Sequence, residues 1–245
     1  MLKPEDFFEL NGYEFREVFE GCEFVWQALQ RIGAFALGYI TDLDREDTIL
    51  GDVRAGAYID DKNSVIIGEG TLVEPGAYIQ GPAIIGKDCQ IRHGAYIRGD
   101  VIIGDGCTVG HATEVKNSIF LDGAQAPHFA YVGDSILGRK VNLGAGTKLS
   151  NVPVTGVKDG ASGKRPSITI KINGSEYDTG LSKFGAVLGD GVQTGCNVVT
   201  NPGTLIGPRT LVYPNLSLKK GYYPPDRIIK LRQEIEQVER VILSL

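Results

Sequence analysis

The 245-residue sequence has only four cysteines and three histidines, and it contains no long apolar run. The cysteines form no CxxC pair, which argues against a zinc site built on cysteine pairs. No stretch approaches the roughly 20 apolar residues that a membrane span requires, so no membrane partner is expected. A formal net charge of −5 gives no general attraction to nucleic acid, and an anionic ligand would need a local basic cluster. The charged start (Lys3, Glu5, Asp6) lacks the apolar run of a secretory signal, so we expect a cytoplasmic protein.

A six-residue period dominates the middle of the chain. An aliphatic residue recurs at every sixth position: Ile67, Val73, Ile79, Ile85, Ile91, Ile97, Ile103, Val109, Val115 and Leu121. Gly, Pro and Asp recur between these positions and are followed by small residues, as tight corners require. An α-helix would show a period of 3.6 and a simple strand a period of two. The pattern therefore predicts an all-β solenoid, a left-handed parallel β-helix of hexapeptide repeats with about 18 residues per coil.

The period divides the chain into three parts. Residues 51–223 form the predicted β-helix, in which Cys89 and Cys107 lie one coil apart as small core fillers. Residues 1–50 show helical spacing instead, which predicts an amphipathic helix that caps the open end of the coils: Val18, Phe19, Cys22, Val25, Trp26, Leu29 and Ile32. Residues 224–245 predict a closing amphipathic helix, with apolar positions Ile228, Leu231, Ile235, Val238 and Ile242.

Two interruptions of the period predict features that leave the β-helix. The first, over Ala126–Ala130, predicts a loop on one face, often the binding face of a solenoid. The second, over residues 155–183, contains alternating segments around Asn173-Gly174, a strong signal for a β-hairpin. We expect this hairpin to form a projecting arm that reaches a neighbouring subunit.

Two cations and one histidine are the candidate chemical groups. Arg98 and Lys116 are 18 positions apart and both follow a core aliphatic residue, so they should stack on adjacent coils. Stacked cations repel unless an anion such as a sugar phosphate lies between them, or unless they are solvated and paired with Asp100 or Glu114. His128 lies in the predicted loop, where it is either a general base poised near neutral pH or an exposed histidine without a role.

Three motifs carry a family resemblance over roughly residues 65–215. They are GHATEVK at Gly110–Lys116, HFAYVGDSILGRKVNLGAGT at His128–Thr147 and KFGAVLGDGVQTGCN at Lys183–Asn197. Together they resemble the acetyltransferase half of the bifunctional N-acetylglucosamine-1-phosphate uridyltransferase / glucosamine-1-phosphate acetyltransferase. They are also similar to the C-terminal β-helix of sugar-1-phosphate nucleotidyltransferase-like proteins.

The resemblance implies a homotrimeric acyltransferase that uses acetyl-CoA. His128 would be the catalytic base that deprotonates the amine of a glucosamine-1-phosphate-like substrate as it attacks the thioester. Ala145 and Cys196 would border the acetyl-CoA. The residues implied to bind the sugar phosphate are Arg98, Glu114, Lys116, Tyr131, Asn142, Asn151 and Lys183. The implied reaction is N-acetylation of an amino-sugar phosphate or a nucleotide sugar.

The chain departs from the family in ways that leave an alternative open. Val152-Pro153-Val154 replaces the usual Tyr-Asp-Gly, Cys196 replaces a serine, and no uridyltransferase domain is present, so nucleotidyl transfer is not expected. The alternative function is a non-catalytic scaffold that binds a sugar phosphate or a nucleotide sugar. A third reading is a zinc-dependent γ-class carbonic anhydrase, because three histidines and the segment Arg98-Gly99-Asp100 echo that family. The close histidine pair of that family is absent, so we expect no metal site.

Overall fold

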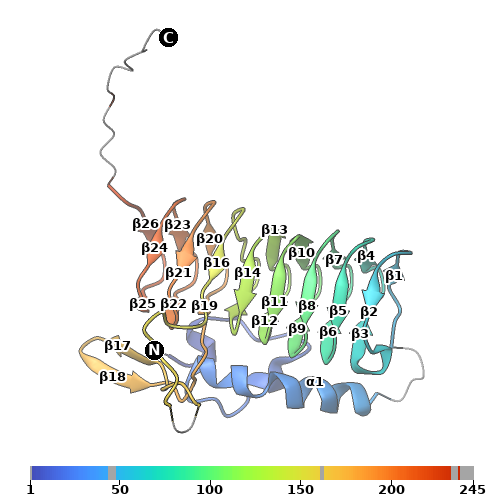
Figure 1. Cartoon of the computed structure of the whole chain (residues 1–245), viewed down its shortest axis with the longest axis horizontal. Coiled ribbons are helices and arrows are strands. Elements are labelled where there is room, and N and C mark those ends of the chain that lie inside the picture. Colours follow the sequence, from blue (N-terminus) through green and yellow to red (C-terminus); the bar gives the residue numbers. More distant parts are fainter. Residues whose placement is uncertain (1, 44–47, 161–162, 233–236, 238–245) are drawn as a thin grey trace.

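The chain was analysed as a computed structural model that describes residues 2–43, 48–160, 163–232 and 237. Its centre is a left-handed parallel β-helix with three flat faces (Figure 1). Face A consists of β3 (Val65–Ile67), β6 (Ala83–Ile85), β9 (Val101–Ile103), β12 (Ser118–Phe120), β15 (Ile136–Leu137), β19 (Ala186–Leu188), β22 (Thr204–Ile206) and β25 (Gly221–Tyr223). The predicted fold class is therefore confirmed.

Faces B and C complete the triangle. Face B consists of β1 (Asp52–Val53), β4 (Leu72–Val73), β7 (Gln90–Ile91), β10 (Thr108–His111) and β13 (Gln125–His128), followed by β20 (Gln193–Thr194), β23 (Leu211–Val212) and β26 (Ile228–Ile229). Face C consists of β2 (Tyr58–Ile59), β5 (Tyr78–Gln80), β8 (Tyr96–Arg98), β11 (Glu114–Lys116), β14 (Tyr131–Gly133), β16 (Lys148–Leu149), β21 (Val199–Thr200) and β24 (Ser217–Leu218). A short 3-10 helix, η4 (Lys62–Ser64), precedes β3.

The residues of the six-residue period fill the interior of the coils. In the paired strands β8 and β11, for example, Ile97 lies beside Val115, and both side chains are fully buried. Cys89 and Cys107 are each 1% exposed within the same core, which confirms them as core fillers. Stacking each aliphatic side chain on its equivalent in the next coil buries apolar surface continuously along the axis, which is the main source of stability in such a solenoid.

Two successive coils are each one residue shorter than the period predicts, since Leu137 pairs with Phe120, 17 positions back, as Phe120 pairs with Ile103. Val115 pairs with Ile97, 18 positions back, but Phe120 pairs with Ile103, only 17 positions back. Phe120 therefore occupies the interior position that the period assigned to Leu121, whose side chain is buried outside the coils, in the cluster on face A. The first shortening occurs at the corner after Val115, where Asn117 has a left-handed φ of 43°, and the second at the corner after Val132, where Asp134 has a φ of 49°.

The shorter coil removes the loop predicted over Ala126–Ala130. Gln125–His128 forms β13, which continues face B and pairs in parallel with β10, so that His128 lies beside His111. The prediction of an extruded loop over Ala126–Ala130 is wrong, because these residues belong to a 17-residue coil that continues the stack.

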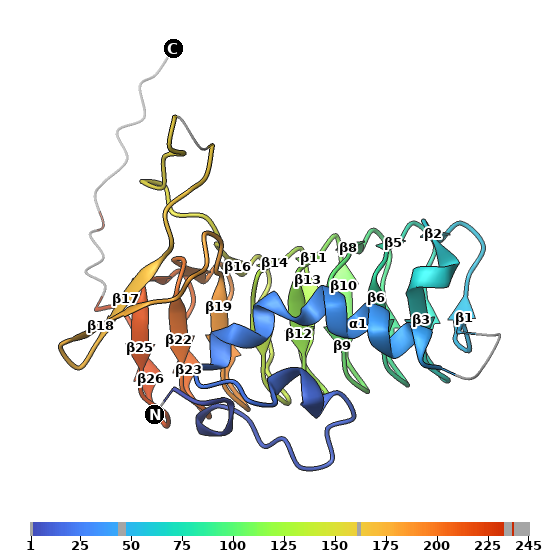
Figure 2. The same ribbon diagram turned by 90° about the horizontal axis from the view of Figure 1, so that it is seen from below.

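The N-terminal segment covers face A along its length (Figures 1 and 2). It comprises the 3-10 helices η1 (Pro4–Asp6), η2 (Arg16–Phe19) and η3 (Val25–Gln30) and the α-helix α1 (Ile32–Thr41). Its apolar side chains, Trp26 among them, pack with the outward row of face A: Ile66, Ile84, Ile102, Ile119, Ile136, Val187 and Leu205. The predicted amphipathic helix over Val18–Ile32 and its place at the end of the coils are both wrong. Face A strands are apolar on both sides, so it is this face that must be covered.

The insertion contains the predicted hairpin. β17 (Thr169–Ile172) and β18 (Ser175–Asp178) pair antiparallel around Asn173-Gly174, which confirms the hairpin. The hairpin does not stand free as an arm, because Ile170 and Ile172 are buried in the cluster on face A and the Tyr177 ring contacts Phe24. It extends the cover of face A beyond the N-terminal segment (Figure 2).

The C-terminal segment begins as part of the β-helix. Ile228 lies in β26, which pairs with β23, so the predicted closing helix does not start there. Most of that predicted helix, including Ile235, Val238 and Ile242, lies outside the described residues. Among the described residues, no helix combines the length and the apolar character needed to cross a membrane.

Candidate active site

The corner between faces B and C aligns the predicted catalytic and CoA residues. His111, His128, Ala145 and Cys196 occupy equivalent positions in successive coils, because the residue after each donates its backbone N–H to the corner carbonyl of the coil before. These hydrogen bonds measure 2.7 Å from Phe129 to His111, 3.1 Å from Gly146 to His128 and 2.8 Å from Asn197 to Ala145. We call this line of residues the B/C corner; His93 begins it, one coil before His111.

The three histidines differ in how their rings are held. The rings of His93 and His111 stack with centroids 5.7 Å apart, and the Nδ1 atom of His93 lies 2.7 Å from the Pro75 carbonyl oxygen. The Nδ1 atom of His111 lies 3.2 Å from the His93 carbonyl oxygen. No such contact to the ring of His128 is found within the described part of the chain, and this residue is exposed. His128 is thus the histidine whose ring nitrogens are open to a substrate.

The histidines do not converge on a point. They follow one another along the axis of the β-helix, and among the described residues no group of three or more His, Cys, Asp or Glu side chains is placed to hold a metal ion. The arrangement of the side chains therefore does not support the interpretation as a zinc-dependent γ-class carbonic anhydrase.

Face C carries the predicted phosphate-binding cations beside this corner. Arg98 and Lys116 follow the paired residues Ile97 and Val115, so they stack on adjacent coils as predicted. The repulsion between them is relieved by carboxylates: Arg98 Nη1 lies 2.7 Å from Glu114 Oε1, and Lys116 Nζ lies 3.3 Å from Asp134 Oδ2. The pairing of Arg98 with Glu114 is one that the sequence had left open.

Asp134 is the site residue that sequence reasoning missed. Its side chain is only 6% exposed, and besides Lys116 it accepts hydrogen bonds from the side-chain amides of Asn117, at 2.9 Å, and Asn151. Its backbone is left-handed, with φ of 49°. The available signal was the aspartate that follows Gly133 inside the HFAYVGD motif, a turn residue that tolerates this conformation.

Tyr131 joins the same network through Asn151. Burial raises the pKa of the Tyr131 hydroxyl, as do the charges of Glu114 and Asp134, while a hydrogen bond with Asn151 acts in the opposite direction. A Cβ atom on Gly133 would lie 2.6 Å from the Tyr131 hydroxyl, so a glycine is needed at this position. The hydroxyl therefore stays neutral near pH 7 and can donate a hydrogen bond to a ligand.

The remaining predicted residues lie at two different edges. Lys183 is exposed and precedes Phe184, whose backbone N–H donates to the Asn151 carbonyl at 2.9 Å, so it reaches the Asn151 edge within one chain. Asn142 instead lies on face B, between Gln125 and Gln193, on the other flank of the B/C corner. Within the described part of one chain, hydrogen bonds and an ion pair thus join Lys116, Asp134, Asn151 and Tyr131 on face C, while the B/C corner and Asn142 lie outside this network.

Face C also presents a row of aromatic rings that sequence reasoning missed. The rings of Tyr58 and Tyr78 stack with centroids 5.0 Å apart, and Tyr78 meets Tyr96 edge-to-face at 5.5 Å. The Arg98 guanidinium lies 5.8 Å from the centre of the Tyr96 ring. The spacing of 18 residues between Tyr78 and Tyr96 was the signal that could have revealed the row.

Comparison with known proteins shows what this chain is similar to. It is 35% identical over 99 residues to a bifunctional sugar-1-phosphate nucleotidylyltransferase/acetyltransferase of Sulfurisphaera tokodaii, which covers 40% of this chain and 22% of the relative. It is 34% identical over 105 residues to the bifunctional protein GlmU of Methanococcus vannielii, which covers 43% of this chain and 23% of the relative. The chain therefore spans about a fifth of the length of these curated relatives.

Solved structures and family descriptions complete the comparison. The Francisella novicida UDP-N-acetylglucosamine acyltransferase aligns with 69% of this chain and 62% of its own, at 17% identity and a TM-score of 0.44. The family described as the GMPPB C-terminal domain matches residues 79–212, which is more than half of the chain and includes the face C cluster, His128 and Ala145. By this match, the chain belongs to the GMPPB C-terminal domain family.

Proposed function

We propose that this protein is a hexapeptide-repeat acetyltransferase that transfers the acetyl group of acetyl-CoA to the amine of a phosphorylated or nucleotide-linked amino sugar. The observation that carries the proposal is the order of residues along the B/C corner. The exposed base His128 is followed by the small residues Ala145 and Cys196, which leave room for an extended thioester chain. The name of the Sulfurisphaera tokodaii relative, which includes an acetyltransferase, supports the same reaction.

His128 acts as the general base in this mechanism. The sugar amine attacks the thioester carbonyl, a C–N bond forms, and the C–S bond to CoA breaks. The imidazole of His128 takes the proton that the amine loses, and the resulting imidazolium returns that proton to the CoA thiolate as it leaves. An imidazole whose ring nitrogens are open to the substrate is suited to accept this proton.

The cluster on face C holds the phosphate. Arg98 and Lys116 keep free N–H donors while each is paired with a carboxylate, because a guanidinium has five N–H groups and an ammonium has three. Glu114 and Asp134 orient these donors, and the neutral Tyr131 hydroxyl adds another. Charge-assisted hydrogen bonds of this kind are stronger than neutral ones.

A homotrimer completes the site in this proposal. The B/C corner is convex, so Asn142 on face B and Lys116 on face C of one chain cannot both face a single ligand. A ligand at a convex corner is enclosed only when a second surface covers it, and a neighbouring subunit would supply that surface. Light scattering should return the mass of a trimer; a monomer at micromolar concentration would contradict this part of the proposal.

The decisive experiment compares two histidines of the same corner. Acetyl transfer from acetyl-CoA to glucosamine-1-phosphate is measured for the wild type, His128→Asn and His93→Asn. His128→Asn should lower the rate by roughly 10²–10⁴-fold, the usual contribution of a general base, whereas His93→Asn should leave it within about twofold. Equal losses in both variants would remove His128 from the mechanism.

A second candidate function is a non-catalytic scaffold that binds the sugar phosphate. The observation in its favour is that both cations on face C are already paired within the chain. Calorimetry that detects glucosamine-1-phosphate binding by a protein without measurable acetyl transfer would favour the scaffold. Turnover that depends on His128 would exclude it.

A further inference from the structure

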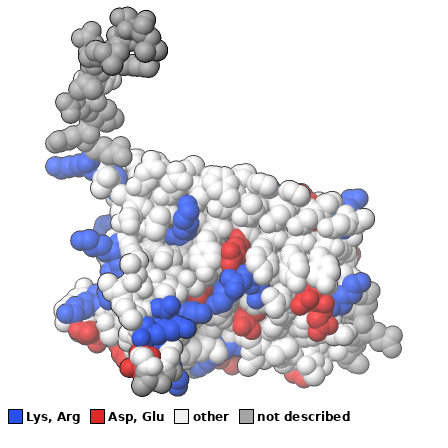
Figure 3. Space-filling view, in the orientation of Figure 1, with Lys and Arg blue, Asp and Glu red and all other residues white. Residues whose placement is uncertain are grey.

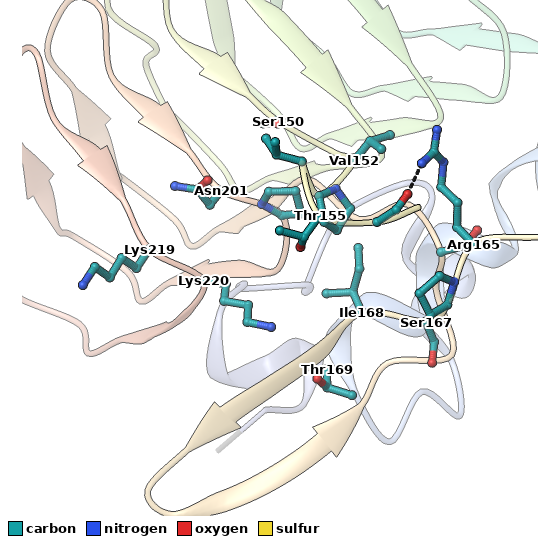
Figure 4. A pocket seen from close by; sticks show the side chains of 16 residues that line it. Ser150, Val152, Thr155, Arg165, Ser167, Ile168, Thr169, Asn201, Lys219 and Lys220 are labelled. Carbon is teal, nitrogen blue, oxygen red and sulfur yellow. Dashed lines mark hydrogen bonds between the residues drawn. The ribbon is translucent and has the colours of Figure 1, made fainter. Parts of the chain in front are cut away.

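A cavity lies beneath the insertion that interrupts the repeats, apart from the candidate active site. Its volume is about 540 Å³. One wall comes from the insertion, through residues 152–156 and 165–169, and the other from the β-helix, through Ser150, Asn201, Lys219 and Lys220 (Figure 4). None of the residues assigned to the acetyl-transfer site lines it. The cavity therefore exists because the chain carries this insertion, and the repeats alone do not form it.

The walls carry cations without acids. Arg165, Lys219 and Lys220 line the cavity, and no aspartate or glutamate among the described residues does. The ion pairs found among the described residues involve none of these three side chains. In a chain with a net charge of −5, this is a local excess of positive charge. Basic side chains also gather in Figure 3 at the end of the molecule that carries the C-terminal coils and the hairpin.

Cationic and polar groups border the cavity on both walls. The guanidinium of Arg165 donates to the Gly156 carbonyl, which fixes the arginine within the insertion and leaves its other N–H groups available. Lys220 extends into the space beside Ile168, while Lys219 lies at the rim (Figure 4). Hydroxyl and amide donors surround them, from Ser150, Thr155, Ser167, Thr169, Ser182 and Asn201.

We propose that this cavity binds a small molecule that carries a diphosphate group. Its volume lies within the range of small-molecule sites, roughly 300–1,000 Å³. Three cations contributed by two walls exceed what one phosphate requires and match a diphosphate, while Val152, Pro153 and Ile168 offer an apolar surface to the uncharged part of the ligand. Such a ligand links the insertion to β24 and so holds the insertion against the β-helix. The proposal does not depend on acetyl transfer.

The test is calorimetric titration of the full chain with inorganic pyrophosphate. The double variant Lys219→Gln/Lys220→Gln should bind pyrophosphate at least roughly tenfold more weakly than the wild type, because charge-assisted contacts of about 1.5–3 kcal/mol are lost. Lys87→Gln removes one exposed positive charge far from the cavity and serves as the control; it should change the affinity by less than about twofold. Lys220→Gln alone should give an intermediate loss, so the result does not rest on one variant.

The outcome separates this site from the phosphate cluster on face C. When the titration is repeated in the Lys116→Gln background, Lys219→Gln/Lys220→Gln should still weaken the binding of pyrophosphate. The proposal is overturned if pyrophosphate does not bind the wild type at millimolar concentration, or if Lys87→Gln weakens binding as much as the cavity variants do. It is also overturned if Lys116→Gln abolishes all binding, since the phosphate would then be held on face C alone.

Discussion

Replacing Lys116 by methionine should destabilise the protein, although the stacked cations in the sequence predict no loss. Repulsion between Arg98 and Lys116 would make the removal of either one neutral or favourable. The structure reverses this expectation, because Lys116 is the cationic partner of Asp134, whose side chain is only 6% exposed. Lys116→Met leaves that carboxylate with the amides of Asn117 and Asn151 as its remaining side-chain partners.

The magnitude follows from the geometry of this pair. Breaking a fully buried ion pair costs about 3–5 kcal/mol, and an exposed pair contributes about 0–1 kcal/mol. The contact between Lys116 and Asp134 is intermediate, because its N–O distance is 3.3 Å, the lysine side chain is 24% exposed and two amide donors remain. We expect a loss of about 1–2 kcal/mol, or roughly 2–4 °C in Tm for each kcal/mol in a chain of this size.

The assay is thermal unfolding at matched protein concentration with a double-mutant cycle. Lys116→Met, Asp134→Asn and the double variant together isolate the coupling between the two side chains. Arg98→Met is the matched control, because its pair with Glu114 is more exposed, at 40% and 34%, and should contribute less than about 1 kcal/mol. A Lys116→Met protein as stable as the wild type would refute the reasoning, and so would a coupling energy near zero.

Three further predictions test the B/C corner, the exposed thiol of Cys196 and the half-buried hydroxyl of Tyr131. Gly110→Ala should destabilise the β-helix, because its Cβ would strike the Pro127 carbonyl. Gly38→Ala in α1 should stabilise the protein by up to about 1 kcal/mol. Urea unfolding of both variants measures the two changes in unfolding free energy, and changes of the same sign would contradict this prediction. A thiol reagent should modify one cysteine in the folded protein, the exposed Cys196, and all four after denaturation; rapid modification of more than one would contradict the buried positions of the others. The raised pKa of Tyr131 means that its contribution to stability is complete below about pH 10 and is lost as the pH rises through the raised value. Above pH 10 the wild type should therefore lose Tm relative to Tyr131→Phe, and parallel pH profiles would contradict this.

The repeat by itself determined the architecture of the protein. A six-residue period can be satisfied only when each aliphatic residue stacks on its equivalent in the next coil, so Ile97 and Val115 had to be neighbours. The same logic placed Arg98 beside Lys116, and the Asn173-Gly174 turn determined the hairpin. These signals are local or strictly periodic, so they can be read along the chain.

Only the tertiary structure decided where His128 lies, which carboxylates pair with the cations of the site, and which segments cover the β-helix. The coil shortened at Asn117 moved His128 from a supposed loop into β13, and this depends on a corner conformation that the repeat does not specify. The sequence shows that the outward side chains of face A are apolar and must be covered. It does not show which segment covers them, because any segment with a complementary apolar face could do so. Asp134 is 18 positions from Lys116, so the period places it on the next coil, but the period does not show which outward side chains form an ion pair across coils. Which side chains pair across two coils depends on short-range charge interactions and packing in the folded structure. The period in the sequence shows only that the coils stack.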